Sequence, residues 1–183
     1  DGLEKIENWP ESLESVGTFA FGGCGNLAEI PPIPARFKTI PDSLFTGCLS
    51  LTHVEIEDGI TQIGNDAFSE CALTEITIPD SVEFVLSGAF AYNKLQDITI
   101  GSGVTDIGYR AFVNNPAKNI YVPKNVETLG SQSIGIEVSG YYSGTIEDFT
   151  LYGNSETAKN YASDNGLTYK TANGKQDLPS QTE

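Results

Sequence analysis

Positive charge and the residues of common catalytic centres are scarce in this sequence. Its 183 residues include 10 lysines and arginines against 25 aspartates and glutamates, for a formal net charge of −15, and a single histidine. Nucleic-acid binding needs clustered lysine and arginine to neutralise phosphates, and anionic membrane surfaces attract basic segments. The composition therefore disfavours both kinds of partner and indicates an acidic, well-solvated surface.

Long hydrophobic runs are also missing. No stretch of about 18 apolar residues occurs, so we expect no membrane insertion. The chain opens at Asp1 in polar sequence that does not resemble a signal peptide, and it contains no methionine, so Asp1 is not expected to be the natural start of the gene product. The hydrophobic fraction of 39% is nevertheless typical of an ordered domain.

An internal repeat organises most of the chain. Phe68, Phe90 and Phe112 are 22 residues apart, and Ile134 continues the series. A small residue precedes each of these positions, and valine, isoleucine or leucine recurs at fixed offsets upstream. Two earlier units repeat at 24 residues instead, and the same columns can be followed through them. The registered units start at residues 3, 27, 51, 73, 95 and 117.

Each unit is predicted to form one coil of a solenoid. Its opening, as in Leu73-x-x-Ile76-x-Ile78, alternates as a strand does. A Pro-Asp-Ser turn and a second short strand are expected next, followed by a glycine, as at Gly64, where φ above zero is a possible requirement. The Ala-Phe segment resembles a helical turn with its phenylalanine inward. We therefore predict a repeat solenoid over residues 3–136, mainly β with short helical turns and parallel strands.

After residue 136 the repeat fades, and residues 137–170 are predicted to cap the solenoid. Residues 149–152 are expected to form a strand and residues 154–165 a helix, which is followed by a short returning strand. A different element of this kind is what should cover the exposed end of a stacked core, giving an α/β cap. Residues 171–183 are polar and are predicted to be a disordered tail.

Three motifs carry a resemblance to a known family. They are Leu73-Thr-Glu-Ile-Thr-Ile-Pro-Asp-Ser-Val82, Ile107-Gly108-Tyr-Arg-Ala-Phe112 and Gly47-Cys48. Together they resemble the BspA-like leucine-rich repeats of bacterial surface proteins, and the segment from Tyr152 to Leu167 is similar to the end cap of that family. The likeness covers residues 3–170 and implies a leucine-rich repeat fold and a secreted or cell-surface bacterial protein, often linked to adhesion or host contact. It carries no catalytic residues over to this chain and names no ligand.

The three cysteines share one column of the repeat. The spacing of Cys24, Cys48 and Cys71 is far from the Cys-x-x-Cys pattern of zinc sites, and Asn93 and Asn115 continue their column. As in leucine-rich repeats generally, the side chain is expected inside the coil, against backbone groups. Adjacent coils stack about 4.7–4.9 Å apart, so distance alone permits a disulfide, but the odd count and the asparagine replacements favour reduced cysteines.

His53 is the only histidine, and Glu55 lies on the same face of its strand. A cysteine–histidine pair would need Cys48 or Cys71 to point outward with it, but their column faces the core. No nucleophile elbow, phosphate loop or metalloprotease motif occurs, and the acids near Asp58 do not alternate as in a calcium loop. We therefore expect no catalytic residue, no cofactor-binding residue and no metal ligand.

The outward positions of the opening strands form the candidate binding face. Solenoids generally bind on such extended faces, and the alternative is a solvated surface without a ligand. Parallel stacking would bring equivalent acids within about 5 Å of each other, which either is tolerated or marks a site for a divalent cation or a cationic partner. The candidate binding face comprises Glu29, His53, Glu55, Glu75, Thr77, Asp97, Thr99, Asn119 and Tyr121.

The leading functional hypothesis is a non-catalytic module, secreted or on the cell surface, that binds a protein or glycan in adhesion or host interaction. The alternative is a structural spacer segment of a larger surface protein, and an enzyme is a distant third. Tyr141, Tyr142 and Tyr152 are a second candidate surface, although a role in covering the core end is favoured. An exposed aromatic cluster would favour binding, and an evenly polar surface would favour the spacer.

Overall fold

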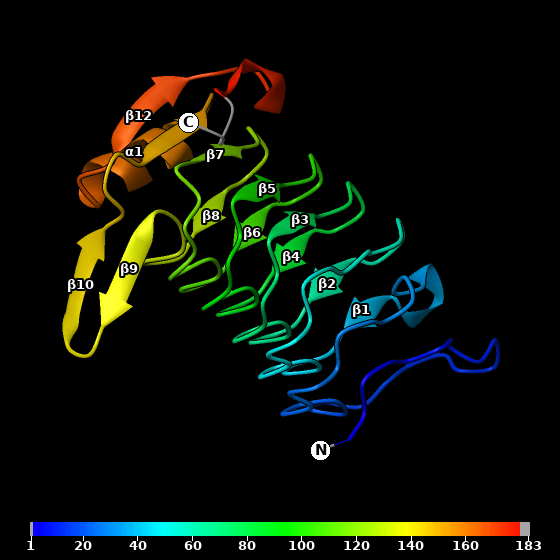
Figure 1. Ribbon diagram of the computed structural model, residues 1–183. Helices are drawn as coiled ribbons and strands as arrows, with labels where there is room; N and C mark the ends of the chain where they lie inside the picture. The colour runs from blue at the N-terminus through cyan, green and yellow to red at the C-terminus, as the bar shows by residue number, and fades with distance from the viewer. Residues whose placement is uncertain (1, 180–183) are drawn as a thin grey trace.

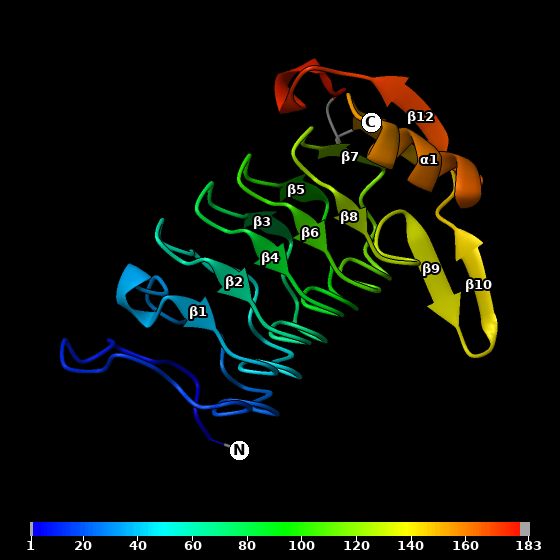
Figure 2. The same cartoon turned by 180° about the vertical axis from the view of Figure 1, so that it is seen from behind.

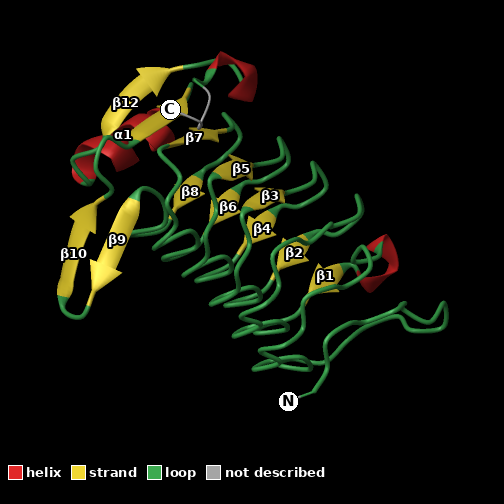
Figure 3. Ribbon diagram, viewed as in Figure 1, coloured by secondary structure: helices red, strands yellow, loops and turns green. Residues whose placement is uncertain are grey.

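Each repeat folds into one coil, and the coils stack side by side along the length of the molecule. The computed structural model describes residues 2–179. Figure 1 shows the coils following one another from the N-terminal end, with the C-terminal elements grouped at the opposite end. The predicted solenoid of parallel strands is confirmed, although loops and turns make up most of each coil (Figure 3).

One side of the solenoid carries a five-stranded parallel sheet. Each of the five coils after the first contributes a strand of only two residues, and successive coils pair in register. This sheet confirms the predicted second short strand in those five units, whereas the first unit has none. In order, its strands are β1 (Thr39–Ile40), β2 (Gln62–Ile63), β4 (Phe84–Val85), β6 (Asp106–Ile107) and β8 (Thr128–Leu129).

The opening strands of the later units form the other side. β3 (Glu75–Thr77) pairs in parallel with β5 (Asp97–Thr99). β7 (Asn119–Val122) pairs with β11 (Thr150–Gly153), a strand supplied by the C-terminal region. In the first coils the same side shows single bridges, and a short 3-10 helix, η1 (Ala35–Phe37), follows one of them.

A column of stacked phenylalanine rings runs through the core. Adjacent rings from Phe21 to Phe112 lie 5.3–5.6 Å apart between centroids, with interplanar angles of 6–16°. Phe45, Phe68 and Phe90 have no exposed surface. Because each ring packs on the rings of neighbouring coils, burying it depends on the stack and not on its own coil.

The segment around each phenylalanine is not the helical turn expected from the sequence. Around Phe68, the residues Asp66 and Glu70 have left-handed φ values of 51° and 56°, which no right-handed helix contains. The amide of Phe68 donates to the carbonyl of Ala89 in the next coil, at 2.8 Å. The amides of a helical turn would point along the helix axis and bond within their own coil. In this segment they point toward the neighbouring coil and bond its carbonyl groups. The turns therefore bond the coils together.

The recurring glycine also serves a different purpose from the one expected. Gly64, Gly108 and Gly130 do not adopt positive φ. A Cβ atom on Gly108 would instead lie 2.6 Å from the backbone nitrogen of Ser87, and one on Gly130 would lie 2.4 Å from that of Tyr109. The column is glycine because neighbouring backbones approach too closely for a side chain. Nothing in the structure explains why Leu86 is accepted in the same column.

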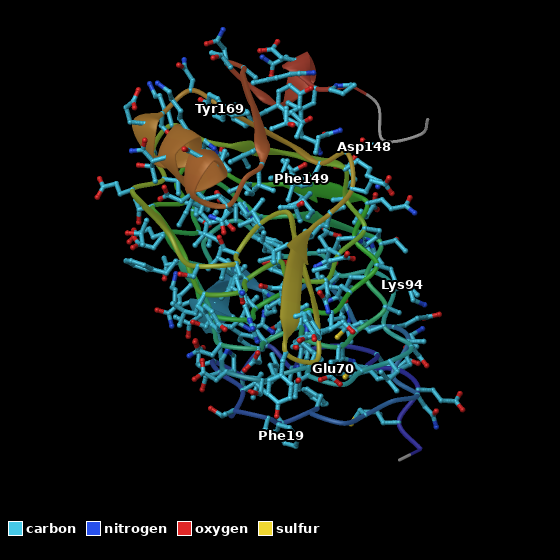
Figure 4. All side chains as sticks on the ribbon, turned by 90° about the vertical axis from the view of Figure 1, so that its left-hand side faces the viewer. Phe19, Glu70, Lys94, Asp148, Phe149 and Tyr169 are labelled. Carbon is cyan, nitrogen blue, oxygen red and sulfur yellow. The ribbon has the colours of Figure 1, made fainter. Side chains whose placement is uncertain are left out.

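The α-helix α1 (Glu156–Asp164) packs over the last coil. The side chain of Ser155 caps its start by accepting a hydrogen bond from the Ala158 amide at 3.2 Å. Its inward face consists of Ala158, Tyr161 and Ala162. The Tyr161 hydroxyl donates to the carbonyl of Ile134 at 3.0 Å and accepts from its amide at 2.9 Å. The helix thus satisfies backbone groups at the end of the repeat. Figure 4 shows Phe149 and Tyr169 at this end and Phe19 at the other.

An antiparallel hairpin, absent from the expected elements, projects beside the last coil (Figures 1 and 2). β9 (Ile136–Ser139) and β10 (Tyr142–Thr145) are joined by a two-residue turn in which Gly140 has a φ of 59°. Tyr141 is 106% and Tyr142 84% exposed, so the expectation that they cover the core is wrong. Tyr152, by contrast, is buried.

The C-terminal residues differ from the disordered tail expected from residue 171. β12 (Thr168–Thr171) pairs with β11, and Ala172 is buried, its amide donating to the Gly153 carbonyl at 3.0 Å. A short 3-10 helix, η2 (Lys175–Asp177), follows. This polar segment is ordered because β11 offers it a free strand edge. Residues 180–183 lie outside the described residues.

Replacing Phe90 with alanine should test the aromatic column. We expect Phe90→Ala to lower the free energy of unfolding by about 3–5 kcal/mol, because the lost ring leaves a cavity between two stacked rings. The matched control is Phe84→Ala in the same coil, whose side chain is 37% exposed, with an expected cost under about 1 kcal/mol. Chemical denaturation measures both, and equal costs would contradict the column.

Candidate binding surfaces

The strand positions predicted as a binding face lie along one side of the solenoid, and only part of this surface is open. Its positions alternate with buried residues such as Val54, Ile56 and Ile76, which direct the intervening side chains outward. Thr99 and Tyr121 are half-buried, and Asn119 is buried. The exposed members are Glu29, His53, Glu55, Glu75, Thr77 and Asp97.

The C-terminal segment covers the far half of this face. The Lys175 ammonium group donates hydrogen bonds to the Asp97 carboxylate and to the Thr99 hydroxyl. Burial, and then the nearby Asp177 carboxylate, raise the pKa of Tyr121. Asn119 was expected to face outward, but it is buried where β7 pairs with β11 of the cap. The candidate face is therefore reduced to its first four coils.

Three of the acidic side chains on the face have a basic neighbour. Glu29 lies 3.2 Å from the Lys5 ammonium, and Glu75 lies 3.6 Å from Nδ1 of His53. With Lys175 on Asp97, both acids of the Glu75–Asp97 pair have a partner of their own. Such exposed pairs add little stability, but they relieve repulsion along the column. No group of three or more potential metal ligands occurs among residues 2–179.

A gap in the strand ladder lies in the open half of the face. Ile56 pairs with Ile33, and β3 pairs with β5, but no strand pairing joins residues 53–56 to β3 in the described chain. On this side, the backbone bond that precedes the gap runs from the Thr74 amide to the Thr52 carbonyl, at 3.3 Å. The gap forms a depression of about 320 Å³. It lies at the coil where the repeat shortens from 24 to 22 residues. His53, Glu55, Glu75 and Thr77 line it.

The cysteine column has a structural role. The Cys71 thiol donates to the carbonyl of Phe45 at 3.2 Å, as the Asn93 amide donates to that of Phe68 at 2.7 Å. Both residue types therefore bond the phenylalanine carbonyl of the preceding coil, which confirms the structural interpretation. All three cysteines are free. Burial raises the pKa of Cys48 to about 11 and that of Cys71 to about 12, so these thiols stay protonated and poorly nucleophilic.

His53 is separated from this column by the wall of the coil. It lies on the exposed strand face and contacts Glu75, whereas Cys48 and Cys71 are buried. His53 therefore has the solvent-exposed carboxylate of Glu75 as its neighbour and no thiol within reach. This environment suits the binding of charged groups and does not suit the activation of a thiol. The arrangement of this face can recognise a ligand through charge and hydrogen bonds.

Tyr141 and Tyr142 of the hairpin are exposed aromatic residues that were expected to cover the end of the core. The signal for the hairpin is present in the sequence, because a glycine at the first position of a two-residue turn, as in Gly140-Tyr141, is a hairpin pattern. The direction of the tyrosine side chains could not be predicted, because the repeat ends before the hairpin and its register no longer shows which side chains point inward.

The fold is a β-solenoid of six coils with short parallel strands and one capping helix, the architecture of a leucine-rich repeat protein. The sequence pattern of the BspA type leucine rich repeat region matches residues 14–137 in six copies. The chain therefore belongs to the BspA-type leucine-rich repeat family.

Two solved structures match the chain at low similarity. A leucine-rich repeat protein from Bacteroides ovatus ATCC 8483 is 21% identical with a TM-score of 0.41, over 92% of this chain and 60% of that one. A leucine rich cell surface protein from Faecalibacterium prausnitzii A2-165 is 16% identical with a TM-score of 0.33, over 95% and 74%. The chain thus spans less than two thirds of the first structure's length. No curated protein matches it. Within the described residues, no helix has the length and apolarity needed to cross a membrane.

Calcium should leave the stability of the protein unchanged. Glu29, Glu75 and Asp97 are paired with a lysine or with His53, and no group of three or more potential ligands occurs among residues 2–179, so a divalent cation gains no preformed oxygen cage there. We expect ~5 mM calcium chloride to shift the melting temperature by less than about 1 °C.

The Lys175→Ala variant is the matched comparison for calcium binding, because it leaves Asp97 without its lysine. Its melting should also be insensitive to calcium, since one freed carboxylate beside Glu75 supplies too few ligands. A clear calcium-dependent rise in the melting temperature of the parent protein would contradict this account and restore the cation site as an interpretation of the acidic column.

Proposed function

We propose that this chain is a non-catalytic binding module displayed outside a bacterial cell, where it holds a protein partner on the open half of the strand face. Membership of the BspA-type family supports a binding or structural role. An adhesion role, and a position at the cell surface or in the secreted fraction, are parts of the same proposal. They agree with the words cell surface protein in the description of one similar structure.

The observation that carries the proposal is the open, acidic and indented surface over the first four coils. Glu29, Glu55 and Glu75 are exposed there, and the depression beside His53 lies at a break in the strand pairing of this side. A second break, between β5 and β7, lies beside the segment that carries Lys175, whereas the break at His53 is left open. A purely structural spacer has no use for a gap that exposes strand edges, because unpaired edges are an aggregation hazard. A ligand that fills the gap removes that cost.

The chemistry of the partner follows from charge. The chain has a net charge of −15, and the open face contributes several carboxylates to it. Complementary potentials speed the association of proteins and discriminate against like-charged partners. The partner is therefore a protein whose contact surface carries lysine and arginine, and complex formation should weaken as salt screens the attraction.

A charge-reversal experiment tests this assignment. The purified chain and its Glu55→Lys, Glu75→Lys double variant are applied to an array of extracellular host proteins at ~0.05 M and ~0.5 M sodium chloride. We expect the parent to bind basic proteins at low salt, and the double variant to lose at least ~10-fold in affinity. The control is Glu83→Lys, Glu127→Lys, which changes the same charge on exposed residues of the opposite sheet side.

The control separates specific recognition from bulk charge. If both double variants lose binding equally, the attraction is non-specific and the strand face is not the site. If the parent binds no protein on the array, the spacer function replaces the proposed one.

A further inference from the structure

The two faces of the β9–β10 hairpin are chemically different. In an antiparallel pair, residues opposite each other project to the same side, and Tyr142 is paired with Ser139 while Gly144 is paired with Glu137. Tyr142, Ser139 and Glu137 therefore share one face, with no side chain at Gly144 to fill it. The other face carries Ile136 and Val138, which pack on the body of the protein.

The hairpin is held in a fixed position although its tip projects. The Asn114 side chain accepts from the Val138 amide at 2.5 Å and donates to the Val138 carbonyl at 2.9 Å. The Asn114 amide donates to the Ile136 carbonyl at 3.0 Å. Ile136 also packs on Ala91 and Val113 in a small apolar cluster. This anchoring fixes the polar face of the hairpin relative to the loop at residues 114–116, as a preorganised site requires.

A cleft of about 620 Å³ lies between that face and the loop. Pro116 and Ile146 give it apolar walls, while Glu137, Ser139 and Tyr142 bring a carboxylate, a hydroxyl and an aromatic ring. A Cβ atom at Gly144 would meet nothing within 4 Å, so the space opposite Glu137 is open. Its volume lies within the ~300–1,000 Å³ of sites that enclose small molecules.

The lining of the cleft selects the kind of ligand. It contains no lysine, arginine or histidine, and Glu137 places a negative charge in it, so phosphorylated or carboxylated ligands are disfavoured. The exposed ring of Tyr142 offers an apolar face with a polar tip, next to a hydrogen-bonding carboxylate and hydroxyl. A neutral sugar matches this combination, because its ring presents apolar C–H groups on one side and hydroxyls around its edge.

A protein partner fits the hairpin less well. A stable protein interface buries about 800 Å² on each side and uses about 20–30 residues. The hairpin strands contribute four residues each, and the open face uses alternate positions of these. The available surface is therefore the size of an oligosaccharide site and too small for a protein interface.

We propose that the cleft between the β9–β10 hairpin and residues 114–116 binds a neutral oligosaccharide, with one sugar ring stacked on Tyr142 and its hydroxyls bonded to Glu137 and Ser139. The site is separate from the strand face, so the domain carries two binding surfaces. Recognition through the hairpin does not depend on the acidic column or on a basic partner.

The test uses the whole chain and a panel of neutral oligosaccharides, namely maltotetraose, cellotetraose, mannotetraose and laminaritetraose, with calorimetry as the measurement. We expect at least one to bind with a Kd below ~1 mM, and Tyr142→Ala to weaken it at least ~10-fold. Glu137→Gln should weaken it by a smaller factor, because an amide retains part of the hydrogen bonding. Tyr141→Ala is the matched control, since Tyr141 is the adjacent exposed tyrosine in the turn, and it should change the Kd by less than ~2-fold.

Two further comparisons make the outcome decisive. Both tyrosines are exposed, so unchanged melting of the variants shows that a loss of binding is not a loss of folding. The Glu55→Lys, Glu75→Lys variant should bind the oligosaccharide as the parent does, which distinguishes failure of this site from failure of the strand face. The proposal is overturned if no oligosaccharide of the panel binds below ~10 mM, or if Tyr142→Ala and Tyr141→Ala have equal effects. Binding of an array protein that depends on Tyr142, without sugar binding, would overturn it in favour of a protein site.

Discussion

The stacking of one coil on the next is the interaction on which the rest of this structure depends. A coil of 22 residues cannot enclose its own phenylalanine, and the rings at 5.3–5.6 Å become buried only by lying on one another. The same spacing sets the backbone bonds of the turns, as from the Phe90 amide to the Ala111 carbonyl at 2.8 Å. The stacking of the coils also brings the Cys71 thiol and the Asn93 side-chain amide to the phenylalanine carbonyls of the preceding coil. At the last coil, α1 covers the exposed end and bonds its backbone through the Tyr161 hydroxyl.

The parts of the fold that repeat could be predicted from the sequence, because a column of matching residues states which side chains point inward. The buried phenylalanines, the cysteine–asparagine column and the outward face all follow from that register. The turn geometry was not predicted, since glycine marks its left-handed positions only in some units, at Gly23, Gly47 and Gly88. Ordinary residues such as Asp66 and Arg110 occupy these positions in other units. The hairpin and the ordered segment around Lys175 lie beyond the repeat. The polar composition of this region does not reveal that the free edge of β11 is available to pair with β12.

The non-repeating elements also decide which surfaces are available to a ligand. The segment that carries Lys175 closes half of the strand face and leaves the gap near His53 open. The hairpin adds an exposed aromatic ring and a mixed cleft that no coil provides. About forty residues at the C-terminal end thus give a regular repeat fold two chemically distinct surfaces. One surface is acidic and extended, and the other is small and aromatic.

Native-state hydrogen exchange of the turn amides is the most direct test of the central claim that the coils are bonded through their turns. If the amides of Phe45, Phe68 and Phe90 bond across the stack, they should exchange only on global unfolding, with protection of about 5–15 kcal/mol. The exposed amides of the hairpin tip should exchange far faster. Turn amides that exchange as fast as the hairpin tip would contradict the account, because the coils would then be held together by their short strands and side chains and not by their turns.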